Sequence, residues 1–220
     1  MHALDKIALT MGVGWASGIN LYAAVFMLGF MGANGYITLP VDLQFLSDPM
    51  VMLISAFMYC VEFFADKTPG VDTAWDTLHT FIRIPAGAIL AMKAVGDTNQ
   101  AVELAAFMMG GTLAGVSHFT KAGSRVLINT SPEPFSNWAA SLSEDVAVIT
   151  GLWAALHYPI AFLVVLALFV CVALWLLPRL WRGIASVFKR LLAVLDRNHN
   201  SPAANSPEMP AGGHNSLPHK

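Results

Sequence analysis

Apolar residues along the chain fall into six stretches that are separated by short polar segments. The stretches are residues 7–33, 49–65, 84–95, 101–119, 142–156 and 159–177. A helix needs about 20 apolar residues to cross the hydrocarbon core of a bilayer. The first, fourth and sixth stretches are long enough, the second is marginal, and the third and fifth are short. The pattern predicts an all-α, polytopic membrane protein with about six transmembrane helices, of which the short ones are tilted, broken or re-entrant.

The composition supports a membrane protein and excludes several other classes. Hydrophobic residues make up 56% of the chain and charged residues make up 12%. In soluble domains, about 45–50% of the residues are apolar and about 25% are charged. These values exclude a soluble enzyme and a disordered protein. The net charge of −2 offers no basic surface for nucleic acid. The expected partners are the lipid bilayer and further copies of the chain, in a homo-oligomer.

The positions of Lys and Arg predict an orientation. If the segments between the stretches alternate between the two sides, 11 of the 12 cationic residues fall on one side and Lys93 falls on the other. Cationic residues are enriched on the cytoplasmic side of membrane proteins. We therefore expect the bacterial inner (cytoplasmic) membrane, with the N- and C-termini in the cytoplasm. In this arrangement Lys6 is cytoplasmic and residues 34–48 lie outside.

Three segments are expected along the chain. Residues 1–178 form the transmembrane domain. Residues 179–197 have apolar positions at helical spacing, with Arg182, Lys189 and Arg190 on the other face. This pattern is typical of an amphipathic helix on the inner leaflet. Residues 198–220 are rich in Pro, Asn, Ser and Gly without an apolar period, so we expect a disordered tail.

The first and fourth stretches share a glycine motif. Gly14 and Gly18 have the spacing G-x-x-x-G, as do Gly111 and Gly115, and each motif is followed by a polar residue. This spacing lets helix backbones approach closely in lipid. One interpretation is that the chain consists of two inverted three-helix halves, as in many transporters. The other is coincidence, because packing glycines are frequent in membrane helices.

Four polar residues follow the second stretch at helical spacing. Asp72, Asp76, His79 and Arg83 are four, three and four residues apart, so a helix that begins near Asp72 carries them on one face. Two carboxylates and an imidazole at this spacing are suited to binding a divalent cation or relaying protons. In the structural alternative, Asp72 caps the helix, Asp76 and His79 pair locally, and Arg83 lies at the lipid headgroups.

A basic face follows at the end of the fourth stretch. His118, Lys121, Arg125 and Asn129 are three, four and four residues apart. Lys121 and Arg125 are suited to holding an anionic group such as a phosphate.

A third polar face leads into the fifth stretch and consists of Asn137, Ser141 and Glu144, beside Asp145. Ionisable groups at membrane depth usually face the protein interior or water. The acidic and basic faces are therefore expected either to neutralise each other in a buried network or to line a shared polar cavity. The sequence contains no Walker loop and no H-E-x-x-H motif, so ATP-driven transport and zinc proteolysis have no support.

Several of these residues lie in strings that resemble a known family. The strings are Asp66-Lys67-Thr68-Pro69-Gly70-Val71-Asp72, Trp75-Asp76, His79-Thr80 and Ser131-Pro132-Glu133-Pro134-Phe135-Ser136-Asn137. Over residues 4–182 the chain is similar to an uncharacterised bacterial integral-membrane family, domain of unknown function 4126. Members usually carry Pro directly after the Arg that matches Arg83, whereas Ile84 intervenes here. The resemblance implies the fold and the membrane placement, and it implies no established activity.

Our leading hypothesis is a transporter or channel for a small ion or anionic solute, with a polar cavity open to the cytoplasm. The substrate-binding candidates are His118, Lys121, Arg125, Asn129 and Asn137. The ion-coupling candidates are Asp72, Asp76, His79, Glu144 and Asp145. No catalytic residue is identified and no cofactor is required, although a divalent cation is one candidate. The alternatives are a membrane-embedded, metal-dependent enzyme that acts on a lipid or lipid phosphate, and a non-catalytic scaffold.

Overall fold

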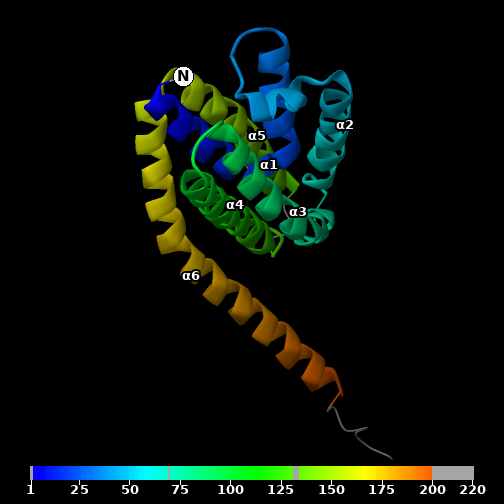
Figure 1. The fold of residues 1–220 in the computed structure, drawn as a ribbon. Helices are drawn as coiled ribbons and strands as arrows, with labels where there is room; N and C mark the ends of the chain where they lie inside the picture. Colours follow the sequence, from blue (N-terminus) through cyan, green and yellow to red (C-terminus); the bar gives the residue numbers. More distant parts are fainter. Residues whose placement is uncertain (1, 69, 131–133, 200–220) are drawn as a thin grey trace, which may run out of the picture. The chain divides into compact units, whose positions relative to one another are not determined.

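The computed structural model describes residues 2–68, 70–130 and 134–199 (Figure 1). Within these ranges the chain is helical and contains no strand, which confirms the predicted all-α class. The elements in chain order are α1 (Ala3–Ala33), the 3-10 helix η1 (Val41–Ser47), α2 (Pro49–Ala65), α3 (Val71–Ala94), α4 (Gln100–Ile128), α5 (Pro134–His157) and α6 (Pro159–His199).

The chain divides into two compact units, residues 1–184 and residues 185–220. Helix α6 begins in the first unit and continues through Pro178 to His199. The predicted end of the transmembrane domain at residue 178 therefore falls within a continuous helix. That residues 179–197 lie on the inner leaflet stays a prediction. The predicted tail lies, from residue 200 onward, outside the described residues.

The third and fifth apolar stretches belong to full-length helices. Helix α3 joins the predicted acidic face to the third stretch in one helix of 24 residues. Helix α5 likewise joins the face that contains Asn137 to the fifth stretch, also in 24 residues. Both helices continue because their polar side chains share a face that is buried against other helices. These two stretches are therefore neither short nor broken.

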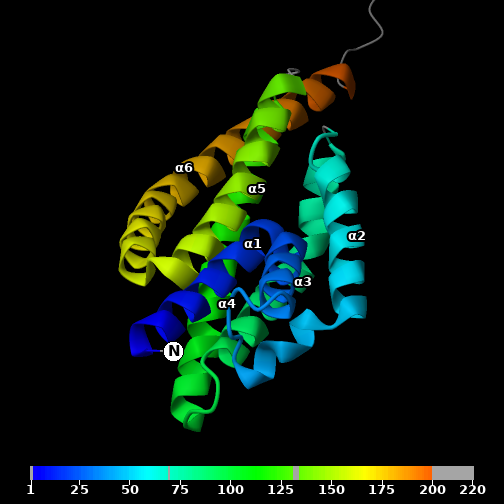
Figure 2. The ribbon, with the colours of Figure 1, turned by 90° about the horizontal axis from the view of Figure 1, so that it is seen from above.

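The break in a helix lies instead in α1, at Asn20. The φ and ψ angles of Asn20 are −147° and 96°, outside the helical region, so α1 consists of two arms, residues 3–19 and 21–33. The Asn20 Oδ1 atom accepts a hydrogen bond from the Ala23 backbone N–H at 2.9 Å, as an N-cap residue does at the start of a helix. The second arm turns back toward the level at which the first begins (Figures 1 and 2).

Both ends of α1 consequently lie at the same end of the first unit. Lys6, from the first arm, lines a cavity with Thr38 and Pro40, which follow the second arm, and with Gly96, which follows α3. We call this end the Lys6 end, and the opposite end, with the turn after α2, the Lys67 end. The prediction had the first stretch crossing the membrane, with Lys6 and residues 34–48 on opposite sides. In the structure α1 bends back at Asn20, so its two ends lie at the same end of the first unit.

From α2 onward, the helices of the first unit run between these two ends. Helix α2 leads to the turn at Lys67, α3 returns to Gly96, and α4 leads back to the Lys67 end (Figure 2). Helix α5 then returns, and Ala155 near its end lies beside Gly12 of the first α1 arm. Helix α6 follows α4 to the Lys67 end, where Leu180 packs on Gly123.

Three helices among the described residues are long and apolar enough to cross a membrane, namely α1, α5 and the part of α6 from Pro159 to Ser186. Helices η1 and α2 together provide a fourth candidate, bent by 66°. Large apolar side chains such as Phe57 and Leu168 are exposed on these helices, as on a surface that contacts lipid. The chain is therefore a membrane protein. The predicted count of six crossing helices is not confirmed, because α3 and α4, which carry charged faces, are not among the candidates.

Small residues allow the first arm of α1 to cross close to α4. A Cβ atom on Gly14 would lie 2.8 Å from the Gly110 Cα atom. A Cβ atom on Gly18 would collide with the Ala114 backbone and the Ser117 hydroxyl. The glycine spacing in α1 thus brings the two backbones together, as in other membrane helix pairs.

We expect Gly18→Ala to lower the free energy of unfolding by about 1–3 kcal/mol, because the added methyl group overpacks the crossing. Gly115→Ala is the matched control, since its Cβ atom would lie 3.9 Å from the Ile84 Cδ1 atom, an ordinary contact distance. The control variant should be as stable as the parent or slightly more stable, because Ala favours the helix. Unfolding in mixed detergent micelles, followed by circular dichroism, measures both. Equal losses in the two variants would contradict the close crossing.

Candidate functional site

Seven charged side chains from four helices and one turn meet near the Lys67 end of the first unit. We call them the charge cluster: Glu62 of α2, Asp66 of the following turn, Asp76 and Arg83 of α3, Lys121 and Arg125 of α4, and Glu144 of α5. Six of the side chains are at most 4% exposed, and Glu144 is 17% exposed. The cluster therefore lies inside the protein, with one member that reaches its surface.

Arg83 joins α3 to α2. Its Nη2 atom lies 2.7 Å from the Glu62 Oε1 atom, and its Nη1 atom lies 2.9 Å from the Asp76 Oδ1 atom. Burial of a guanidinium is costly unless carboxylates pair with it, and here two do. Glu62 was not among the predicted site residues because it is the one charged residue within an apolar stretch. The available signal was the charge itself, since an ionisable residue inside a predicted span has a partner or a function.

The Lys121 ammonium is the centre of the cluster. Its Nζ atom lies 2.8 Å from the Asp66 Oδ2 atom, 3.3 Å from the Glu62 Oε1 atom and 3.1 Å from the Ile19 carbonyl oxygen. Two further carboxylate oxygens, from Glu144 and Asp76, lie 3.5 and 3.7 Å away. The Ile19 carbonyl ends the first arm of α1, where the break at Asn20 leaves it without a helical partner. The Lys121 ammonium is thus surrounded by five oxygen atoms at the break in α1.

Arg125 holds α5 and the turn after α2. It forms a two-point pair with Glu144, with Nη2–Oε2 at 2.6 Å and Nε–Oε1 at 3.3 Å. Its Nη1 atom donates to the Asp66 backbone oxygen at 2.7 Å and to the Asn137 backbone oxygen at 3.4 Å. The guanidinium donors are therefore directed at protein oxygens.

Asp72, Asn129 and Asn137 form a separate hydrogen-bonded chain that links α3, α4 and α5. The Asn129 side-chain amide donates to both Asp72 carboxylate oxygens, at 2.8 and 2.9 Å. The Asn137 amide donates to the Asn129 Oδ1 atom at 2.8 Å. Asp72 also accepts from the Gly70 N–H at 2.9 Å, at the start of α3. The N-cap residue of α3 is Gly70, so Asp72 lies in the first turn of the helix, outside the charge cluster, and the predicted capping role of Asp72 is wrong.

The two candidate histidines have partners that define their tautomers. The His118 Nδ1 atom lies 3.4 Å from the Arg83 Nη1 atom, which only donates, so His118 carries its proton on Nε2, 2.7 Å from the Thr80 hydroxyl. The His79 Nδ1 atom lies 2.9 Å from the Trp75 carbonyl oxygen and must donate to it. The His79 Nε2 atom therefore accepts from the Tyr22 hydroxyl at 3.0 Å. Only His118 touches the charge cluster.

Asp145 lies beside the break in α1, where the Asn20 Nδ2 atom donates to its Oδ1 atom at 3.0 Å. Lys67, in the turn after α2, donates to the Ser141 hydroxyl at 3.1 Å and lies 2.9 Å from the centre of the Phe63 ring. Burial lowers the pKa of the Lys67 ammonium below its ordinary value. These contacts attach α5 to the tip of α1 and to the turn.

With the side chains as they lie in the structure, no group of three or more His, Cys, Asp or Glu side chains among the described residues could hold a metal ion. The predicted carboxylate–imidazole face does not converge, because Asp76 pairs with Arg83 while His79 bonds to Tyr22. Among the described residues, the geometry therefore gives no support to the alternative of a metal-dependent enzyme.

The charge cluster is unbalanced. It contains four carboxylates and three cationic groups, so it carries one net negative charge when all seven are ionised. Three buried carboxylate oxygens of the cluster have no hydrogen-bond partner among the described residues: Glu62 Oε2, Asp66 Oδ1 and Asp76 Oδ2. Unpaired acceptors in a buried site favour the uptake of a proton or a cation.

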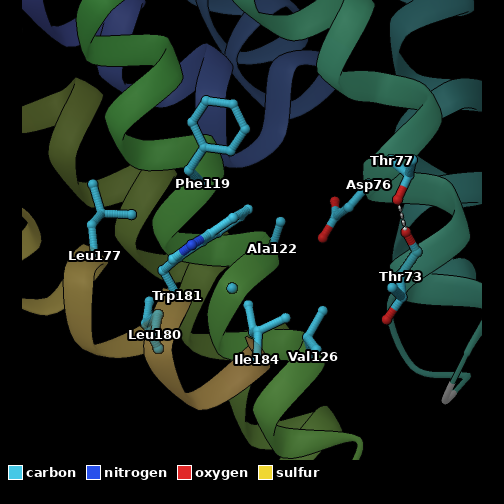
Figure 3. A pocket seen from close by; sticks show the side chains of 11 residues that line it. Thr73, Asp76, Thr77, Phe119, Ala122, Val126, Leu177, Leu180, Trp181 and Ile184 are labelled. Carbon is cyan, nitrogen blue, oxygen red and sulfur yellow. Dashed lines mark hydrogen bonds between the residues drawn. The ribbon is translucent and has the colours of Figure 1, made fainter. Parts of the chain in front are cut away.

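Two cavities that are lined by described residues reach the cluster. One, of about 350 Å³, is lined by Lys121 and Glu144 together with the hydroxyls of Thr120, Ser124 and Ser143. The other, of about 470 Å³, reaches Asp76 (Figure 3). Between the cavities the charged side chains pack against one another, and the Lys121–Asp76 contact of 3.7 Å connects the two linings.

We expect Arg83→Met to lower the free energy of unfolding by about 3–5 kcal/mol, because it leaves buried carboxylates uncompensated. The double variant Arg83→Met with Glu62→Met should recover most of this loss. Lys93→Met is the matched control, since the Lys93–Asp42 pair is 40% and 44% exposed and such pairs contribute at most about 1 kcal/mol. Unfolding in detergent measures all three. Equal losses for Arg83→Met and Lys93→Met would contradict a buried network.

Comparison with the curated proteins and with the solved structures finds no match to the chain. A family model does match, over residues 7–179, which include every member of the charge cluster. The family carries no assigned activity, so the function has to be argued from the geometry. The chain belongs to the family described as domain of unknown function 4126.

Proposed function

We propose that the protein is a membrane transporter or channel for a small cation, a proton or a monovalent metal ion. The observation that carries the proposal is the Lys121 ammonium at the tip of the broken helix α1, among oxygens of Ile19, Asp66 and Glu62. Irregular backbone at membrane depth is tolerated where it is buried or lines an aqueous cavity. Broken helices whose free carbonyls face cations are the usual ion sites of secondary transporters.

A small cation is favoured over an anionic solute. The donors of Lys121 and Arg125 are directed at carboxylates and backbone oxygens. The net negative charge of the cluster repels an anion and attracts a cation. When the Lys121 side chain moves away, the five surrounding oxygens become a site for a cation of similar size.

The cavity of about 350 Å³ is the proposed entrance, because both Glu144 and Lys121 line it. Glu144 is the one cluster carboxylate with appreciable exposure, 17%. It therefore exchanges protons or ions with the cavity more readily than the buried members do. Release of Glu144 from Arg125 opens the cluster from this side. The predicted roles of Asp76 and Glu144 in ion coupling are kept in this proposal.

The proposed placement puts the Lys67 end in the cytoplasm. The cationic residues of the first unit at or near this end are Lys67, Arg83, Lys121, Arg125, Arg179 and Arg182, against Lys6 and Lys93 at the Lys6 end. The cytoplasmic enrichment of Lys and Arg supports this orientation. In it, α1 is re-entrant from the outer side and the N-terminus is outside. Residence in a bacterial inner membrane and assembly into a homo-oligomer stay predictions.

The test is ion flux into liposomes that contain the purified protein. The parent should dissipate a gradient of H⁺, Na⁺ or K⁺ faster than protein-free liposomes. Asp76→Asn and Glu144→Gln should lower that flux by at least about tenfold, because each removes a charge from the proposed site. Lys93→Met, outside the cluster, should leave the flux unchanged. Parent flux equal to that of protein-free liposomes for all three ions would refute the proposal.

A scaffold is the second candidate, because all three cationic groups of the cluster are paired with carboxylates. Exchange of the pair, Glu62→Arg with Arg83→Glu, distinguishes the two functions. A scaffold needs only the pairing, so the exchanged protein should regain both stability and the cellular phenotype. An ion site needs the carboxylate at its particular place, so the exchanged protein should fold and still fail to conduct.

A further inference from the structure

The cavity of about 470 Å³ lies between α3, α4 and the first-unit part of α6 (Figure 3). One wall is polar and consists of Thr73, Asp76 and Thr77, which share a face of α3. The other walls are apolar, with Phe119 on α4 and Trp181 on α6 among their side chains. The cavity therefore has one polar wall and several apolar walls, as a site for an amphiphilic molecule would have.

The Asp76 carboxylate has one free acceptor in this wall. Its Oδ1 atom pairs with Arg83 at 2.9 Å. Its Oδ2 atom is buried and has no hydrogen-bond partner among the described residues. The carboxylate points toward the apolar side chains across the cavity (Figure 3). A buried carboxylate oxygen without a donor is costly, so the site favours a ligand that donates.

The two threonines of the wall also offer acceptors and no donors. The Thr77 hydroxyl donates to the Thr73 carbonyl oxygen at 2.7 Å. The Thr73 hydroxyl donates to the Asp72 Oδ1 atom at 3.3 Å and accepts from the Asn129 Nδ2 atom at 3.0 Å, which leaves one lone pair. Each hydroxyl hydrogen is thus used within α3, and only oxygen lone pairs remain for a ligand. An ammonium group, with three donors and no acceptor, matches such a wall.

We propose that this cavity binds a protonated organic amine with an apolar body. The ammonium donates to the free Asp76 oxygen and to the threonine hydroxyls, and the apolar body packs against Phe119 and Trp181. The volume is in the range of sites for small organic ligands, about 300–1,000 Å³. A phospholipid does not fit as well, because its phosphate adds negative charge beside a cluster that already has an excess. This binding is measured at equilibrium, so its test does not depend on whether the protein conducts ions.

The experiment is calorimetric titration of the purified full-length protein in detergent with 4-phenylbutylammonium and with its neutral counterpart 4-phenylbutanol. The amine should bind saturably, one per chain, and at least about tenfold more tightly than the alcohol, since charge-assisted hydrogen bonds are stronger than neutral ones. Asp76→Asn should remove this difference between the two probes. Ala122→Phe, which fills the cavity away from the carboxylate, should abolish binding of both.

Ala167→Phe is the matched control for the filling variant. It lies in a second apolar cavity, of about 640 Å³, whose lining includes Leu163 and Met108 and no charged residue. This control should bind the amine as the parent does. Equal binding of amine and alcohol by the parent, the result expected of a groove for lipid tails, overturns the proposal. Parent-like binding by Ala122→Phe also overturns it, and this comparison decides the question if Asp76→Asn does not fold.

Discussion

A buried ammonium group needs oxygen atoms on every side, and in this protein those of Lys121 come from four separate segments. They are the first arm of α1, the end of α2 with its turn, α3 and α5. Each segment must therefore bring an oxygen atom to the depth at which Lys121 lies. The break in α1, the turn after α2 and the polar starts of α3 and α5 meet this requirement together. Removal of the ammonium would leave carboxylates from three of these segments facing one another.

The break in α1 has two consequences that follow from one residue. Asn20 caps the second arm through its Oδ1 atom and binds Asp145 through its Nδ2 atom. The first arm thereby ends in a free carbonyl at Ile19, which accepts from Lys121. The change of direction also returns the chain to the Lys6 end, so both ends of α1 lie at the same end of the first unit. The helix tip and the topology are thus two results of the same hydrogen bonds.

The pattern of apolar and polar residues predicted helices and the faces that their polar residues share, but it did not predict how these faces pair with one another. The predicted second stretch coincides with α2, Pro49–Ala65, because apolar length and a proline start mark it clearly. Asp76, Lys121 and Glu144 were identified because helical spacing reveals a shared face, and the structure brings them together. The spacing did not reveal that the faces neutralise each other rather than line one open cavity, since that depends on how the helices are rotated.

Two features left weak signals in the sequence. Glu62 is the one charged residue in an apolar stretch, and Asp66, four residues later, was assigned to a turn, so the two were not combined into one helical face. Asn20 interrupts a stretch long enough to cross, and a single amide inside an apolar helix is commonly a packing residue. Asn20 can also start a helix, by accepting a hydrogen bond from the Ala23 N–H three residues later. That role is known only from the structure, which shows this hydrogen bond.

The re-entry of α1 is the claim on which the ion site depends, and the sidedness of its two ends tests it most directly. Cysteines at His2, Gln44 and Thr130, in a chain in which Cys60 and Cys171 are replaced by Ser, report exposure to a membrane-impermeant thiol reagent. The account predicts that His2→Cys and Gln44→Cys react from one side of the membrane and Thr130→Cys reacts from the other. Reaction of His2→Cys and Gln44→Cys from opposite sides would contradict it.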